Sequence, residues 1–224
     1  FTDALRVLGE YDLLNGQVPQ VVIDYLRAGE RGDHPETPKS GDPIFKNVRN
    51  HLLGSAHASL EAAANYCHSV GVTPVILGDT VTGEAKDVAL MQASIAREIY
   101  FYNAPFAKPV ALLSGGECTV TIPPGVKGRG GRCTEFLLAL LAATEDLPSL
   151  AALAADTDGI DGSEDNAGGW FDSSVRKFAE SKKILAKKYL ADHDAYGFFK
   201  EARALVETGP TLTNVNDFRI LLID

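Results

Sequence analysis

Apolar side chains recur at helical spacing in the first half of the chain. Residues 2–14 carry them on one face, behind the N-cap candidates Thr2 and Asp3, and a second helix is expected from Pro19 through VVIDYLRAG. The elements expected next are a strand at 46–55, a helix at 57–69, a short buried strand at 73–78 and a helix at 84–100. Strands that alternate with helices predict an α/β fold with mostly parallel sheets and flanking helices.

Two prolines in the segment NAPFAKP, residues 103–109, interrupt this pattern. The expected elements beyond it are strands at 110–113 and 118–122 around the turn SGGE, a glycine loop at 125–131, a helix at 134–143, a buried strand at 150–155, an acidic loop at 156–172, a basic helical stretch around 182–188, and strands at 204–207 and in FRILLI. The pattern therefore divides the chain into 1–107 and 108–224.

Composition and charge exclude several classes of protein. With 21 basic against 30 acidic residues the net charge is −9, which disfavours a general nucleic-acid surface. No apolar run approaches the roughly 18 residues of a membrane span, so no membrane partner is expected. Three cysteines without CxxC spacing fit reduced thiols and a cytoplasmic location better than disulfides or zinc.

Glycine is concentrated in one part of the chain, because ten of the 21 glycines lie between Gly115 and Gly169. The segment GVKGRGGRCTEF, residues 125–136, presents a glycine loop before a helix start, where backbone N–H groups and the helix dipole favour an anion. Arg129 and Arg132 add charges suited to phosphate or carboxylate, beside Gly130 and Gly131. A flexible solvated loop is the alternative.

This glycine loop matches no common nucleotide motif. It lacks the GxxxxGK[ST] pattern of a Walker A loop. It also departs from the dinucleotide fingerprint, since Cys133 takes the position of the third small residue. A nicotinamide-dependent reductase is therefore the second enzymatic interpretation and not the first.

Carboxylates follow the expected buried strand directly, in DTDGIDGSEDNAG at 156–168. At the C-terminal end of a strand, Asp156, Asp158 and Asp161 are placed to hold Mg²⁺ or to act as a base toward a hydroxyl. A calcium EF-hand does not fit, because Ile160 falls at a ligand position. The alternative is a cluster of caps and turns.

Two further polar segments are candidates for ligand contact. The segment SGGE, made of Ser114, Gly115, Gly116 and Glu117, is either a tight hairpin turn or a close approach to a ligand. The segment TGPTLTNVND, at 208–217, is either a ligand-contacting loop or a plain turn. Its candidate ligand contacts are Thr211, Asn214, Asn216 and Asp217.

Four ordered segments resemble the glycerate 2-kinase family, whose C-terminal domain is called MOFRL: LLSGGECTVTI, GRGGRCTEFLLAL, LAADTDGIDGSEDNAGGWFD and TGPTLTNVNDFRILLI. Two upstream segments look like the later part of that family's first domain: ETPKSGDPIFKNVRNHLLGS and ILGDTVTGEAKDVA. The resemblance implies that 1–107 is the C-terminal part of an incomplete, Rossmann-like first domain. It implies that 108–224 is a complete MOFRL-type α/β domain.

The resemblance also implies a chemistry: ATP-dependent phosphorylation of glycerate at its 2-hydroxyl, with Mg²⁺, in a cleft between two α/β domains. Arg132, and secondarily Arg129, would bind the glycerate carboxylate or the migrating phosphoryl group. Asp158 would orient or deprotonate the hydroxyl, or hold Mg²⁺ through water. The other expected binding residues are Ser114, Gly115, Gly116, Glu117, Gly130, Gly131, Glu135, Asp156, Asp161, Thr211, Asn214, Asn216 and Asp217.

The chain departs from the family pattern in three respects. Cys133 stands where the family usually has asparagine, and Asp156 where it more often has glycine. The family's first domain begins well before Phe1, with a lysine thought to serve catalysis, so an N-terminal truncation is expected. The alternatives to the kinase are an NAD(P)H-dependent hydroxypyruvate reductase and an inactive ligand-binding fragment. The expected partner is a small 2-hydroxy acid, with a homodimer left open.

Overall fold

The computed structural model describes all 224 residues, and these form two compact units, Phe1–His51 and Leu52–Asp224. The first unit contains helices α1 (Thr2–Glu10) and α2 (Gln20–Glu30) and a 3-10 turn η1 (Pro43–Phe45). The Phe1 ring packs so closely on Gly29 that a Cβ there would lie 2.4 Å from it. Both predicted helices are confirmed.

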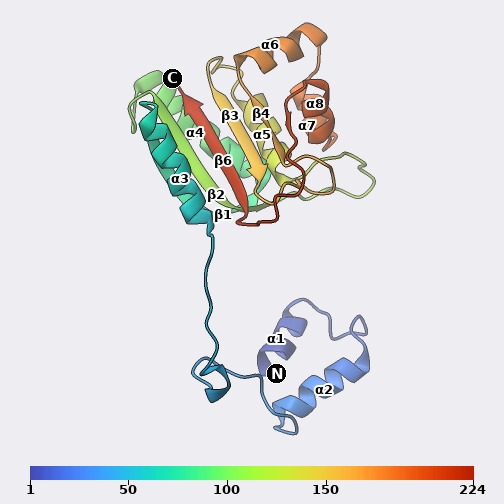
Figure 1. The fold of residues 1–224 in the computed structure, drawn as a ribbon. Coiled ribbons are helices and arrows are strands. Elements are labelled where there is room, and N and C mark those ends of the chain that lie inside the picture. Colours follow the sequence, from blue (N-terminus) through green and yellow to red (C-terminus); the bar gives the residue numbers. More distant parts are fainter. The chain divides into compact units, whose positions relative to one another are not determined.

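The second unit is built on one six-stranded sheet in the order β1-β2-β6-β3-β4-β5 (Figure 1). Its strands are β1 (Thr73–Glu84), β2 (Val110–Thr119), β3 (Ala151–Asp156), β4 (Gly168–Phe171), β5 (Leu205–Val206) and β6 (Asp217–Ile223). Its helices are α3 (Ala56–Ser69), α4 (Ala85–Tyr102), α5 (Arg132–Ala143), α6 (Ser173–Lys182), α7 (Ala186–Ala191) and α8 (Ala195–Glu201). The predicted α/β class is confirmed.

The strand directions differ from the prediction of a mostly parallel sheet. Only β1 and β2 pair in parallel, joined through the crossover helix α4. The last strand, β6, inserts between β2 and β3 and runs antiparallel to both, and β4 is antiparallel to β3 and β5. Alternating strands and helices predict parallel pairing only where each helix returns the chain to the same edge, and here that holds for one pair.

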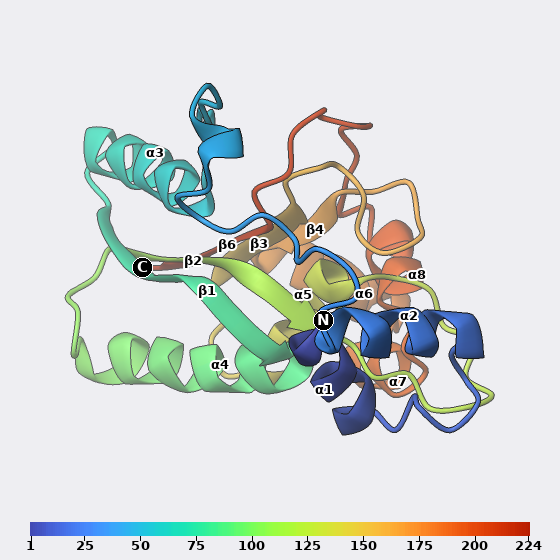
Figure 2. The same ribbon diagram turned by 90° about the horizontal axis from the view of Figure 1, so that it is seen from below.

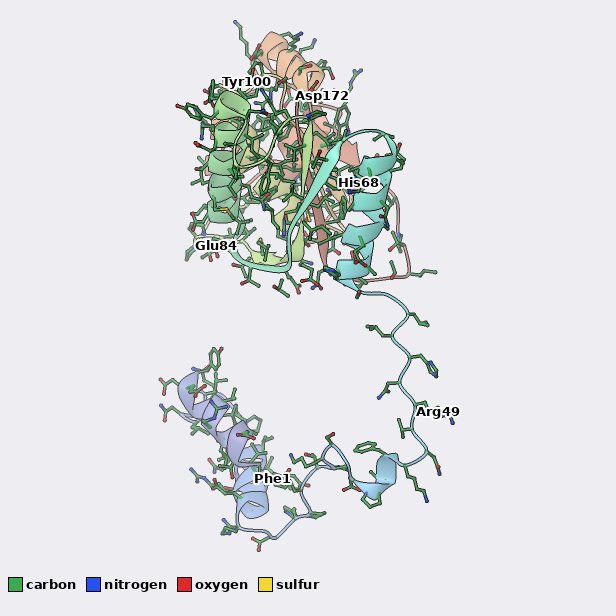
Figure 3. The ribbon with its side chains drawn as sticks, turned by 90° about the vertical axis from the view of Figure 1, so that its left-hand side faces the viewer. Phe1, Arg49, His68, Glu84, Tyr100 and Asp172 are labelled. Atoms are coloured by element: carbon green, nitrogen blue, oxygen red, sulfur yellow. The ribbon has the colours of Figure 1, made fainter.

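Helices cover both faces of the sheet. Figure 2 shows α3 on one side of β1 and β2 and α4 on the other, and Figure 3 shows the same layers beside the labelled residues His68 and Tyr100. Helix α5 packs against α4 and over β3 and β4. Its residues Phe136, Leu137, Leu138 and Leu140 are fully buried, so this helix forms the centre of the core. None of the helices combines the length and apolar character that a membrane span requires.

Four local predictions were wrong. Strand β4 forms within the predicted loop 156–172, and the helical stretch predicted around 182–188 is interrupted between α6 and α7. No strand forms at 46–55, which is irregular and includes Arg49, labelled in Figure 3. The segment SGGE is no hairpin turn but lies inside the continuous strand β2. Gly116 is needed there because its φ is +113° and a Cβ would lie 2.3 Å from the backbone of Val81 in β1. The glycines thus allow two strands to approach.

Candidate active site

Arg132, the first residue of α5, lies at the centre of three carboxylates. Its Nε donates to Asp217 Oδ1 at 2.7 Å and its Nη2 to Asp156 Oδ2 at 2.5 Å. Its Nη1 lies 3.3 Å from Glu117 Oε1. The partners come from the ends of β6, β3 and β2, so the sheet brings together four of the residues predicted for the site.

A second arginine holds one of these carboxylates from behind. Arg219 is completely buried and its Nη2 donates to Asp217 Oδ2, whose side chain is also completely buried. Arg219 further contacts the carbonyl of Gly115 at 3.4 Å and the Cys118 sulfur at 3.2 Å. Asp217 therefore bridges two arginines and fixes the Nε side of Arg132.

Burial and charge shift the titration of this cluster. Burial by itself lowers the pKa of Arg132, but the hydrogen bond to Asp217 and the neighbouring carboxylates raise it above its usual value. Burial raises the pKa of Asp156 to about 6, although the Asp158 N–H and the Arg132 charge act to lower it. Arg132 thus remains a cation at every physiological pH.

Asp158 lies where the 156–161 loop meets the 208–217 loop. Its Oδ1 accepts from the Ile160 N–H at 2.9 Å, and its Oδ2 accepts from Asn214 Nδ2 at 3.2 Å. The backbone N–H of Thr211 donates to the Asp158 carbonyl at 3.0 Å. Asn216 completes the junction, because its carbonyl accepts from the Thr157 hydroxyl at 2.8 Å. The structure therefore brings the predicted base and the predicted polar loop into contact.

The N-terminus of α5 is already capped by a carboxyl group, that of Asp161. The Asp161 carboxylate accepts from the Cys133 N–H at 2.9 Å, the Thr134 N–H at 2.8 Å and the Thr134 hydroxyl at 2.7 Å. The side chain is completely buried, and burial raises its pKa despite these hydrogen bonds. The expectation that these N–H groups face an external anion is therefore wrong for Cys133 and Thr134, because Asp161, from another loop, caps them.

The glycine loop is docked on the turn before α8. Gly128 lies against this turn so closely that a Cβ would be 2.2 Å from the carbonyl oxygens of Asp192 and His193. The Arg129 N–H donates to Asp194 Oδ1 at 3.3 Å. Glu135, in the first turn of α5, is buried, and its Oε1 lies 2.9 Å from Nδ1 of His193 in the turn before α8. Glu135 thus faces His193 and takes no part in the ion pairs of Arg132.

Gly130 and Gly131 end the glycine loop, and Gly131 is the N-cap of α5. Three other predicted residues lie inside the sheet. Ser114 is buried and its hydroxyl accepts from Gln92 at 3.1 Å. Gly115 and Gly116 are buried in β2, next to β1 and β6. Of the segment SGGE, only Glu117 reaches the Arg132 cluster as an exposed side chain.

The carboxylates form no ready-made metal cage, since no group of three or more His, Cys, Asp or Glu side chains is placed to hold an ion. Arg132 occupies the space between the three nearest acids. Mg²⁺ bound with nucleotide needs only one or two protein carboxylates, with phosphates and water as the other ligands. Asp158 fits that smaller role, because its carboxylate forms no ion pair.

Sequence reasoning missed two residues, Arg219 and His193. Arg219 lies in the apolar segment FRILLI, but alternate positions of β6 are buried, and it shares that face with Leu221 and Ile223. Its period-two spacing from these residues is a signal that could have found it. His193 belongs to no motif.

Comparisons with known proteins find relatives along nearly the whole chain. Residues 110–217 match the model of the MOFRL family. The chain is 40% identical to the glycerate 2-kinase of Pyrococcus horikoshii, covering 100% of this chain and 49% of that protein. It is 44% identical to a putative hydroxypyruvate reductase of Agrobacterium vitis, covering 99% and 48%. A crystal structure of glycerate kinase from Thermotoga maritima superposes with a TM-score of 0.81 at 34% identity, over 100% of this chain and 50% of that one.

The chain thus spans about half the length of the curated relatives it matches. The relatives match along nearly all of its residues, and the MOFRL match includes Glu117, Arg132, Asp156 and Asp217. Residues 110–217 therefore belong to the MOFRL family, and the chain as a whole is a relative of glycerate 2-kinases.

Proposed function

We propose that this chain is part of a glycerate 2-kinase-type phosphotransferase, which converts ATP and glycerate to ADP and 2-phosphoglycerate. The observation that carries the proposal is the Arg132 cluster. A permanently charged guanidinium, partly exposed, is held by buried carboxylates where three strand ends and a polar loop meet. Because the chain spans about half of its relatives, the activity is proposed for a protein of their length.

Phosphoryl transfer depends on positioning and charge stabilisation more than on covalent participation of the protein. In the proposed reaction, Asp158 accepts the proton of the glycerate 2-hydroxyl as that oxygen forms a bond to the γ-phosphorus of ATP. The bond from this phosphorus to the bridging oxygen breaks, and ADP leaves with the electron pair. Arg132 binds the glycerate carboxylate. Mg²⁺, when bound with ATP, neutralises phosphate charge.

We further propose that residues 1–107 are the later part of a first domain and that 108–224 form the MOFRL domain. The MOFRL match begins at residue 110, which supports that boundary, although both segments contribute strands to one sheet. Three buried free cysteines support a reducing, cytoplasmic location.

The reductase alternative is disfavoured by Asp161. A dinucleotide fold places pyrophosphate on the backbone N–H groups at a helix N-terminus. Here the N–H groups of Cys133 and Thr134 are bound by the Asp161 carboxylate. The glycine loop is also held against the turn before α8, by the Arg129 N–H.

The test is an ATP-dependent assay for 2-phosphoglycerate, run on the protein of relatives' length that carries this chain and on the 224-residue chain. Oxidation of NAD(P)H with hydroxypyruvate is measured in parallel. Phosphorylation without reduction supports the proposal, and reduction without phosphorylation contradicts it. If the 224-residue chain shows no turnover, calorimetry with ATP and with glycerate then measures whether it still binds these ligands.

A further inference from the structure

Glu117 is the least firmly held of the three carboxylates around Arg132. Its Oε1 lies 3.3 Å from Nη1, compared with 2.5 Å and 2.7 Å for the contacts of Asp156 and Asp217. Its side chain is 57% exposed, whereas those of Asp156 and Asp217 are 3% and 0% exposed. An exposed ion pair at this distance is weak.

The other two carboxylates are held by both of their oxygens. Asp217 Oδ2 is bound by Arg219, and Asp156 Oδ1 accepts from the backbone N–H of Asp158 at 3.2 Å. The Glu117 side chain makes no geometrically aligned hydrogen bond, so only its charge holds it at Arg132. Of the three nitrogens of the guanidinium, Nη1 is therefore the one whose partner can be exchanged.

We propose that Glu117 is an internal competitor for substrate: its carboxylate occupies Nη1 of Arg132 until the carboxylate of a small hydroxy acid displaces it. The inference rests on the proposed function and deepens it, since it names the atom and the residue that set affinity for the acid. Two carboxylates have the same planar geometry and the same charge, so one replaces the other without rearrangement of the buried pairs behind Arg132.

The size of the effect follows from the weakness of the pair. Exposed ion pairs are worth about 0.2–1 kcal/mol, which corresponds to a change of about 1.5- to 5-fold in a binding constant. The variant Glu117→Gln removes the competing charge and keeps the shape of the side chain. We therefore expect it to bind glycerate about 1.5- to 5-fold more tightly.

The experiment compares Glu117→Gln with the parent protein by calorimetry with glycerate and by the KM values for glycerate and ATP. The expected result is tighter glycerate binding and a lower glycerate KM with an unchanged ATP KM. The matched control is Glu84→Gln. Glu84 is an acid where β1 meets α4, its carboxylate accepts from Thr119 and Thr121, and it makes no contact with Arg132.

A second background tests whether the effect acts through Arg132. In Arg132→Gln, the further change Glu117→Gln is expected to leave glycerate binding unaltered, because there is no guanidinium to compete for. Unchanged or weaker binding by Glu117→Gln overturns the inference, as does an equal gain in Glu84→Gln or a gain that persists in Arg132→Gln. Tighter glycerate binding in a protein without kinase activity would refute the proposed function and leave this inference standing.

Discussion

Replacement of Asp161 by alanine is expected to destabilise the unit Leu52–Asp224 by about 2–6 kcal/mol. The change leaves two backbone N–H groups of α5, those of Cys133 and Thr134, without an acceptor. Each buried unsatisfied donor costs about 1–3 kcal/mol. The Thr134 hydroxyl adds little, because its single proton can turn to the Gly131 carbonyl, which lies 3.2 Å from the hydroxyl oxygen. The sum exceeds the loss of an ordinary N-cap, which is about 1 kcal/mol.

The chain offers a matched control in Asp172, the N-cap of α6. Its carboxylate also accepts three hydrogen bonds, from the N–H and hydroxyl of Ser174 and the N–H of Val175. It caps its own helix and is partly exposed, so water can replace it. Asp172→Ala is therefore expected to cost about 1 kcal/mol, and Asp161→Asn, which keeps one acceptor oxygen, should fall between the two.

Urea unfolding followed by the fluorescence of Trp170 measures these differences. Trp170 is the single tryptophan and lies in β4, so the signal reports on the unit that contains α5. Far-UV circular dichroism recorded on the same samples checks that the transitions coincide. If Asp161→Ala lost no more stability than Asp172→Ala, the cap supplied by the 156–161 loop would not be holding α5.

Three further changes test other parts of the structure. Arg132→Met is expected to lower kcat/KM by about 100- to 1000-fold, as for loss of a charge-stabilising group, and an unchanged kcat/KM would exclude the role. Burial raises the pKa of Asp156 from 3.8 to about 6, so the folded state binds this proton more tightly, and its contribution to stability should fall as pH rises between these values. Asp156→Asn should remove that part of the pH dependence in urea titrations. Gly128→Ala should free the glycine loop and speed its proteolysis, since the new Cβ meets backbone oxygens at 2.2 Å, whereas Gly54→Ala, with 3.7 Å to its nearest neighbour, should not.

Hydrophobic periodicity correctly predicted the helices and strands that bury one regular face or a continuous apolar run. Helices α3, α4 and α5 and strands β1, β3 and β6 bury one face or a whole apolar run, and the sequence shows that directly. Strand β4 was missed because GGWF begins with two glycines, which carry no β signal and follow an acidic loop. Strand direction was mispredicted because local sequence does not record that β6 returns between β2 and β3.

The sequence predicted which residues belong to the candidate site better than it predicted how they pair. Charged residues at strand ends and at a helix start are visible in the sequence, and Arg132, Asp156 and Asp217 do meet. Which acids pair with which cations depends on the sheet order, which brings β6 beside β2 and β3. Arg219 was not predicted as a site residue, because an arginine in an apolar strand is usually expected to face solvent. Its ion pair with the bridging Asp217 compensates the cost of burying its charge.

The clustered glycines between Gly115 and Gly169 have a different role in the structure from the one predicted from the sequence. Glycines beside arginines suggested backbone open to a ligand, yet several of them meet other backbone or a buried side chain. A Cβ on Gly131 would lie 2.3 Å from the Asp161 carboxylate, and one on Gly159 would lie 2.2 Å from the carbonyl of Gly209. The loops approach this closely because those side chains are absent. The same approach lets Asp161 cap α5 and so fixes its first residue, Arg132, among the carboxylates of three strands. The glycines therefore serve the site by positioning its cation.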